Sequence, residues 1–329
     1  MDSSTKRKDI VSALLRFGVS GALLYWLSRQ IDVDKTTQIL RSSDLADIAW
    51  AGLIFLFVNY LILVRWNIFV RAFRLAVPFS AVARYFLIGL FGNLFLPSAI
   101  GGDVIKIFGL CRYTDQKAKV VASVLLDRMS GFGGIVVVSS VSFVLGYKLL
   151  KNLSLAMPLV VLAGISLVML SVLFNERLYS LCCSVFSPFP NIRKKVMALH
   201  YDVVLLKDRK DAIYKAVGMS CVVQVILAVI WFLTGRALGQ DVGFVYYLIF
   251  VPIICVSASI PSVAGLGTRE AAAVFLLGKV GVEAGVAVSI SLISSMFFMV
   301  VVGLAGGLVF LLTKAPQEKD LKPPVPAAG

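Results

Sequence analysis

Long runs of apolar residues alternate with short charged stretches along most of this 329-residue chain. A run of about 20 apolar residues has the length of a helix that crosses a bilayer. The pattern therefore predicts an all-α, polytopic membrane protein with about six full spans, at residues 10–28, 47–64, 129–147, 155–174, 212–234 and 284–312. A secretory signal is not expected, because no small-residue cleavage pattern follows the first run.

Two apolar regions are interrupted by proline, glycine and charged residues, which a smooth membrane helix would exclude. The first reads "FLPSAIGGDVIK" at 95–106 and the second "SIPSVAGLGTRE" at 259–270. Basic residues follow the first break and are expected inside the cell, so we expect 85–113 to be re-entrant, and 243–278 likewise. Non-helical backbone at membrane depth is tolerated where protein shields it or where it lines a wet cavity. Two full crossings are the alternative.

The two breaks share an upstream context, which indicates an internal repeat. "WNIFVRAFRL" at 66–75 resembles "WFLTGRALGQ" at 231–240, and the prolines follow the matching arginines after 26 and 25 residues. Because the first copy follows a span that ends inside and the second a span that ends outside, the repeats are expected to be inverted. We place repeat 1 at about 47–147 and repeat 2 at about 212–312, within one transmembrane domain at 10–313. Inverted repeats with discontinuous helices are typical of transporters whose site lies near the bilayer midplane.

Composition and charge support a membrane location and set the expected orientation. The chain is 59% hydrophobic with a mean hydropathy of +0.91 and a net charge of +14. Its basic residues collect between the spans, which predicts a cytoplasmic N-terminus at 1–9, a cytoplasmic stretch "RWNIFVRAFR" at 65–74, a basic amphipathic segment at about 176–211 on the cytoplasmic surface, and a disordered cytoplasmic tail at 314–329. No nucleic-acid module is visible, and the five cysteines and single histidine have no metal-site spacing. We expect no nucleic-acid partner, no metal and no cofactor.

The charged residues at the breaks are the candidate substrate-binding groups. A charge near the bilayer centre costs about 2.5–3.5 kcal/mol on insertion scales, so such residues are usually paired or functional. Asp103 and Thr268 could simply cap helices, and Asp127 and Arg128 could form a surface ion pair at the entrance of a span. The candidates for headgroup binding are Asp103, Lys106, Asp127, Arg128, Arg269, Glu270 and Arg71. The backbone breaks that would cradle the headgroup are Pro97, Ser98, Gly101, Gly102, Pro261, Ser262, Gly265 and Gly267.

Together, "FLPSAIGGDVIK", "LLDRMSG" at 125–131 and "IPSVAGLGTREAAAVFLL" resemble the lysylphosphatidylglycerol synthase transmembrane family, also described as flippase-like. The resemblance covers about 10–313 and implies translocation of a lipid. Lys106 stands where arginine is frequent in that family, so bidentate phosphate contact would be lost there. The soluble aminoacyl-transferase domain of bifunctional members is absent, so we expect that this chain does not itself charge a lipid.

These observations predict a lipid flippase of a prokaryotic cytoplasmic membrane rather than an enzyme. The expected cargo is an anionic or aminoacylated phospholipid, or a polyprenyl- or hopanoid-type lipid. Membrane lipids are the expected partners, together with a lipid-biosynthesis enzyme and a second copy of the chain. One alternative is a membrane subunit of a lipid-linked glycosyl or aminoacyl transferase pathway. Another is an ion-coupled transporter of a small solute.

Overall fold

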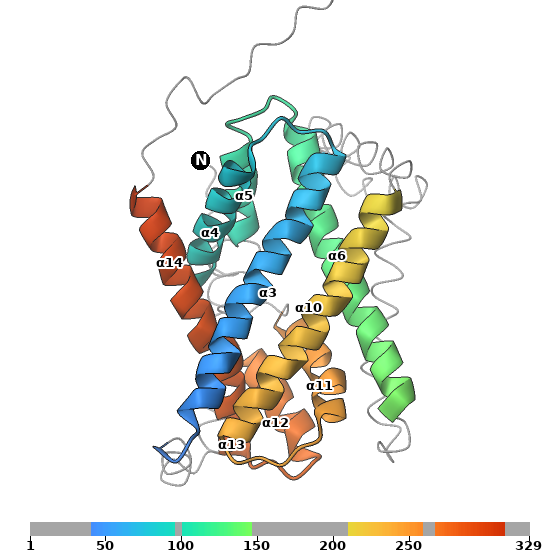
Figure 1. Cartoon of the computed structure of the whole chain (residues 1–329), viewed down its shortest axis with the longest axis vertical. Helices are drawn as coiled ribbons and strands as arrows, with labels where there is room; N and C mark the ends of the chain where they lie inside the picture. Colours follow the sequence, from blue (N-terminus) through green and yellow to red (C-terminus); the bar gives the residue numbers. More distant parts are fainter. Residues whose placement is uncertain (1–40, 96–100, 147–209, 259–266, 313–329) are drawn as a thin grey trace, which may run out of the picture.

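The computed structural model describes residues 41–95, 101–146, 210–258 and 267–312, and every element within these ranges is helical (Figure 1). The prediction of an all-α chain is thus confirmed for the described residues. The predicted spans at 10–28 and 155–174, nearly all of the segment 176–211 and the tail at 314–329 lie outside them. So do five of the break residues, Pro97, Ser98, Pro261, Ser262 and Gly265.

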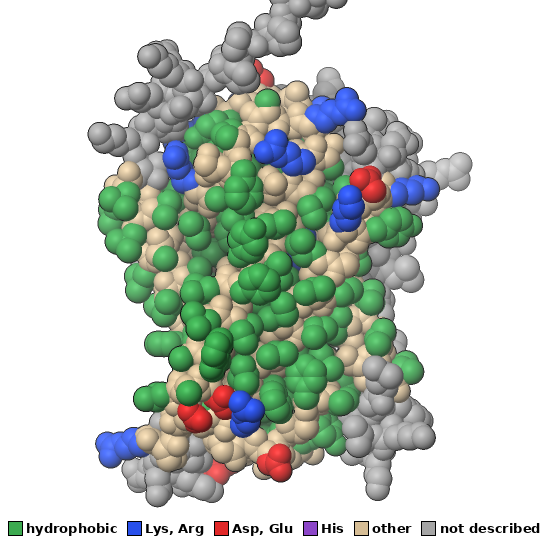
Figure 2. All heavy atoms as spheres, in the orientation of Figure 1, with side chains coloured by type: hydrophobic (Ala, Val, Ile, Leu, Met, Phe, Trp, Pro, Cys, Tyr) green, Lys and Arg blue, Asp and Glu red, His purple; other side chains and the backbone are tan. Residues whose placement is uncertain are grey.

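Four long apolar helices within the described ranges have the length and composition of membrane spans. They are α3 (Leu45–Ala72), α6 (Lys117–Gly146), α10 (Lys210–Ala237) and the continuous run of α13 (Ala284–Ser291), a π-helical turn (Leu292–Phe297) and α14 (Phe298–Leu312). At 1.5 Å per residue, helices of this size are about 42–45 Å long, enough to cross a bilayer. Figure 2 shows apolar side chains over the middle of the visible face and charges mainly at its two ends.

Two pairs of short helices complete the arrangement. α4 (Phe79–Phe95) and α5 (Gly101–Leu110) occupy the upper half of the molecule in Figure 1, whereas α11 (Phe244–Ser257) and α12 (Thr268–Gly278) occupy the lower half. The order long, short, short, long occurs twice, and α3 runs antiparallel to α10 in the same view. The two long helices that open these four-element segments therefore point in opposite directions.

The buried faces of α3 and α10 correspond position by position. Each helix has 28 residues, so Leu45 aligns with Lys210 and every later position of α3 has one counterpart in α10. Each buried position of α3 then has a buried counterpart, which pairs Asp47, Ala51, Val58, Leu63, Arg65, Trp66, Phe69 and Val70 with Ala212, Ala216, Val223, Ala228, Ile230, Trp231, Thr234 and Gly235. The Trp and Arg-Ala pattern of the sequence is therefore part of a repeat in side-chain burial that runs the whole length of both helices.

Each half has its own apolar core, and a third core joins them. Trp66 lies in the core of the first half and Trp231 in that of the second. Val58, Val223 and Phe298 belong to the core between α3, α10 and the last helix. The halves are also interlocked, since α14 packs closely on α4 and α6 packs on both α10 and α11.

Glycines allow the close approach of α14 to α4. A Cβ added at Gly306 would overlap the carbonyl oxygen of Leu87, and one added at Gly303 would lie 2.6 Å from Leu94 Cδ1. Membrane helices often use small residues in this way, because van der Waals packing drives their association where water does not.

Two predicted span limits were wrong, and both errors have the same cause. The span predicted at 47–64 continues as helix to Ala72, so Arg65 lies within the helix and not in a loop after it. The span predicted at 129–147 begins at Lys117, so Asp127 and Arg128 lie one-third of the way along α6 and not at its entrance. Hydropathy ends a span at a charged residue, but a charge with a partner inside the protein does not end the helix.

Candidate functional site

The N-terminal turn of α5 holds a carboxylate between two cations. Asp103 Oδ1 lies 3.2 Å from Lys106 Nζ on the same helix, and Asp103 Oδ2 accepts a hydrogen bond of 2.5 Å from Arg128 Nε of α6. Asp103 and Lys106 are buried, whereas 43% of the Arg128 side chain is exposed. The break after α4 thus delivers Asp103 to α6, which favours an ion-pair role for Asp103.

Lys106 also lies against two aromatic rings. Its Nζ is 5.4 Å from the ring centroid of Trp66 and 4.9 Å from that of Phe86. A cation above the face of an aromatic ring is attracted by the ring's quadrupole. Lys106 therefore has an anionic partner and two aromatic partners inside the protein.

Arg65 is a buried charged residue that the sequence analysis does not place among the site residues. Its Nε donates a hydrogen bond of 2.7 Å to Asp127 Oδ1 on α6, and its Nη1 donates one of 3.0 Å to the Ser220 hydroxyl on α10. Only 9% of the Arg65 side chain and 6% of the Asp127 side chain is exposed. Gly131 of α6 also lies beside the guanidinium, where an added Cβ would be in ordinary contact with Nη1 at 3.4 Å. One arginine therefore connects three long helices.

The N-terminal turn of α12 is built around a buried glutamate. Glu270 Oε2 accepts a hydrogen bond of 2.7 Å from the backbone N–H of Gly267, and Oε1 accepts one of 3.1 Å from the Ser291 hydroxyl. Gly267 has φ of 88°, a conformation that residues with a Cβ rarely adopt. Only 1% of Glu270 is exposed. The Glu270 carboxylate therefore caps its own helix and also fixes α12 to α13. Thr268, which the sequence offered as a possible capping residue, is the first residue of the helix and lies inside it.

Arg269 differs from the other buried cations because part of its guanidinium is unsatisfied. Its Nε lies 3.2 Å from Glu270 Oε1, but its buried Nη2 has no hydrogen-bond partner among the described residues. The residue as a whole is 7% exposed. A buried donor without an acceptor is costly, and in proteins such a group commonly marks a place where a ligand or an ordered water binds.

Ser291, the partner of Glu270, lies directly before the π-helical turn Leu292–Phe297. Single π-helical turns inside α-helices occur frequently at functional sites. The buried Ser294 hydroxyl within the turn also has no partner in the part of the chain that the structure describes. The irregular turn therefore coincides with the region that holds Glu270.

The remaining predicted residues divide into two groups. Gly101 and Gly102 begin α5 and are buried, and the Gly102 N–H donates a hydrogen bond of 2.8 Å to Asn93 Oδ1 of α4. Arg71 lies in the last turn of α3 with an exposed side chain, and no described contact joins it to the buried charges.

We call the set Arg65, Asp103, Lys106, Asp127 and Arg128 the first charged cluster and the set Arg269 and Glu270 the second.

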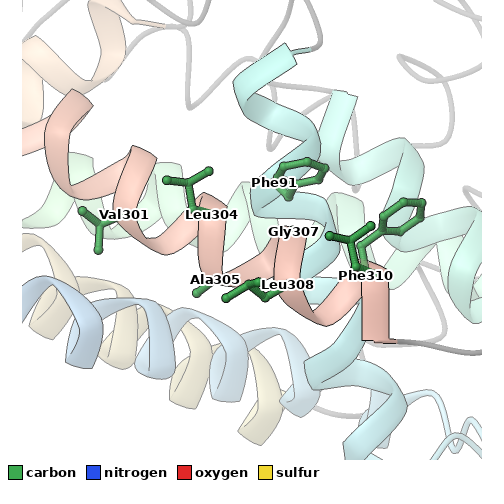
Figure 3. Close-up of a pocket in the computed structure, with 8 residues that line it drawn as sticks. Phe91, Val301, Leu304, Ala305, Gly307, Leu308 and Phe310 are labelled. Carbon is green, nitrogen blue, oxygen red and sulfur yellow. The ribbon is translucent and has the colours of Figure 1, made fainter.

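An apolar groove lies apart from both clusters. It has a volume of about 570 Å³ and runs along α14 where that helix passes Phe91 of α4 (Figure 3). Leu304, Leu308 and Phe310 line it, and none of its described lining residues is charged. Because the groove is lined by apolar side chains, the candidate site for a charged group lies at the clusters.

Apolar helices of membrane length that enclose paired charges define a polytopic helical membrane protein with a polar interior. Within that class, the chain belongs to the family described as the lysylphosphatidylglycerol synthase transmembrane region, whose model matches residues 13–306. It is also similar to a protein of Pyrococcus horikoshii described as a UPF0104 membrane protein, with 24% identity over 319 residues, 88% of this chain and 92% of that protein. The family predicted from the three sequence motifs is therefore confirmed.

Proposed function

We propose that the protein is a flippase that moves a lipid with an anionic headgroup across the membrane, with the headgroup passing the two charged clusters. The family supports a function connected with membrane lipids. The two clusters together contain four cations and three carboxylates, Arg65, Lys106, Arg128 and Arg269 against Asp103, Asp127 and Glu270. The excess of one positive charge belongs to the first cluster, because Arg269 and Glu270 balance each other in the second, and it attracts a negative charge toward the pair of clusters.

The unsatisfied Nη2 of Arg269 is the observation that carries this proposal. Arg269 lies in the first turn of α12, where the helix dipole also favours an anion. A headgroup phosphate would supply the missing acceptor. The hydrocarbon part of the lipid would meanwhile stay among the exposed apolar side chains of the outer helix faces.

The proposed topology follows from the half-length helix pairs and the charged ends. We propose that α4 with α5 and α11 with α12 are re-entrant pairs, and that 10–28 and 155–174 complete six full spans. Among the described residues, eight Lys and Arg against two Asp lie near the end at which α3 finishes, whereas three Lys and Arg against four acids lie near the opposite end. The positive-inside rule makes the basic end cytoplasmic, with both termini on that side of the cytoplasmic membrane.

Transport assays in proteoliposomes test the proposal. A fluorescent phosphatidylglycerol analogue in both leaflets is exposed to a membrane-impermeant quencher, and the rate at which the inner-leaflet pool becomes accessible is measured. Arg269→Gln should lower the protein-dependent rate by about 10- to 100-fold, the equivalent of one charge-assisted hydrogen bond. Lys279→Gln is the matched control, because Lys279 is an exposed cation at the other end of α12 that lies over the Phe275 ring.

Two results would count against the proposal. Equal rates for the wild type and Arg269→Gln would show that Arg269 does not contact the transported group. No protein-dependent movement of any anionic lipid, together with uptake of a soluble anion, would favour the solute transporter, and formation of a new lipid from a lipid donor would favour a transferase subunit.

A further inference from the structure

The two ends of the α3–α10 helix pair differ in the contacts that join the helices, and the residue-by-residue alignment of α3 with α10 shows which residue is responsible. At one end Arg236 forms a bidentate ion pair with Asp47, with Nε–Oδ2 at 2.7 Å and Nη2–Oδ1 at 2.5 Å. The backbone N–H of Asp44 also donates a hydrogen bond of 3.0 Å to the carbonyl of Ala237. We call these two contacts the end latch, because they tie the start of α3 to the end of α10.

Among the described residues, the opposite end of the same helix pair has no such latch. In the alignment of α3 with α10, the counterpart of Arg236 is Arg71 and the counterpart of Asp47 is Ala212. The position that would hold the acid for Arg71 is therefore occupied by a methyl group. No ion pair joins Arg71 to Asp211, the acid that precedes Ala212 in the sequence, within the described ranges, and both side chains are exposed.

The helix geometry agrees with this chemical difference. In Figure 1 the latch lies at the lower end of the α3–α10 pair, whereas toward the upper end the two helices diverge in projection and α6, which contacts both, lies beside them. Between the ends, Val58, Val223 and Phe298 form an apolar core that suits a pivot. Inverted repeats exchange roles when a transporter changes the side to which its site is open. In the exchanged conformer the Arg71 end would close and the Asp47 end would open.

We propose that the Asp47–Arg236 latch selects which of two conformers the protein occupies, and that Ala212 is the position where the opposing latch is missing. The proposal rests on the proposed function, because it gives the charged clusters alternating access to the two membrane surfaces. The latched conformer is favoured because only one end of the helix pair has an acid at the latch position. The two helices thus share one pattern of burial, and a single position makes their conformational equilibrium asymmetric.

The decisive experiment adds the missing acid as well as removing the existing one. Spin labels are placed in a cysteine-free protein in lipid nanodiscs, at Leu45 and Gly243 to report on the latched end or at Arg74 and Tyr214 to report on the other end, and interlabel distances are measured by pulsed EPR. All four label positions are exposed. The variants are Asp47→Asn and Ala212→Asp, singly and together, and the matched control is Asp241→Asn, which removes an exposed acid from the latched end.

We expect Asp47→Asn to lengthen the Leu45–Gly243 distance distribution and to shorten the one between Arg74 and Tyr214. Ala212→Asp should shorten the latter on its own, because it supplies a partner for Arg71. The double variant should show the largest exchange of the two populations, and Asp241→Asn should match the wild type. Unchanged distances in both Asp47→Asn and Ala212→Asp would overturn the latch. Distances that respond as expected in a protein that moves no lipid would retain the latch and reject the transport proposal.

Discussion

The ion pair between Arg65 and Asp127 gives a sharp test of the buried interior. Removing one partner leaves the other charge uncompensated, which costs about 3–5 kcal/mol when the pair is buried. Both side chains are at least nine-tenths covered, and Arg65 also donates to Ser220, so we expect the full effect. Asp127→Leu should therefore shift the unfolding equilibrium by roughly a hundred- to several thousand-fold.

A double-mutant cycle separates the pair from its surroundings. Arg65→Met with Asp127→Leu removes both charges and keeps apolar volume, and such replacements are often neutral or stabilising. Stability is measured in micelles by denaturant unfolding followed by helical circular dichroism, with Lys279→Met as an exposed control expected within about 0.5 kcal/mol of the wild type. If Asp127→Leu alone costs less than about 1 kcal/mol, or if the double variant costs as much as the sum of the single ones, the two charges are not a buried pair.

Three further predictions concern helix packing and the loop between α5 and α6. Gly102→Ala should cost about 1–3 kcal/mol in the same unfolding assay, because its Cβ would overlap the Gly89 carbonyl oxygen, whereas Gly133→Ala, with 3.6 Å to its nearest neighbour, should cost nothing. Gly306→Ala should lower stability by a similar amount by separating α14 from α4, and Gly306→Ala with wild-type stability would contradict that packing. Burial raises the pKa of the Cys111 thiol and the charge of Lys117 partly opposes that shift, so less thiolate is present at a given pH than for a free cysteine. In a variant with Cys111 as its sole cysteine, the rate of maleimide labelling should therefore rise with pH above about 8.5. Lys117→Gln should lower that rate, because it removes the charge that favours the thiolate.

The correspondence between α3 and α10 could be expected from the sequence because it depends on local patterns. The Trp and Arg-Ala matches at 66–72 and 231–237 have a fixed spacing, and the structure extends them to two whole helices. The last span was also predicted with its observed limits, Ala284–Leu312, because no charged residue interrupts it. Spacing is sufficient to match the two long helices, and hydropathy is sufficient to limit a helix that contains no charged residue.

The partners that join different helices could not be predicted, because they lie far apart in sequence. Arg65 and Asp127 are separated by 62 residues, and Arg65 and Ser220 by 155. A sequence window shows Arg65 only as a charge at the end of an apolar run, which is why hydropathy assigns it to a loop. The contact of Lys106 with a headgroup stays a prediction, whereas its aromatic neighbours Trp66 and Phe86 come from other helices and could not be predicted.

One sequence signal could have placed Arg65 inside the first long helix. The predicted span at 212–234 includes Trp231, whereas the predicted span at 47–64 stops before the matching Trp66. If the two tryptophans are equivalent, the first span has to continue past Trp66 and so has to contain Arg65. Burial on α3 does continue to Val70, so Arg65 lies within the buried face of the helix.

The number of residues between equivalent elements of the two repeats changes at the second break, and the partners of the first-turn acid also differ between the repeats. The offset from Leu45 to Lys210 also relates the starts of α4 and α11, but the first-turn acids Asp103 and Glu270 are slightly farther apart. Asp103 is held by two cationic side chains, whereas among the described residues Glu270 is held by the Gly267 N–H, the Ser291 hydroxyl and one arginine. The first charged cluster therefore gives each of its cations a carboxylate partner, and the second leaves the Arg269 Nη2 without an acceptor in the described part of the chain. If the protein is the proposed flippase, the unequal breaks of the two repeats would give an anionic headgroup its preferred contact on the second repeat, at Arg269.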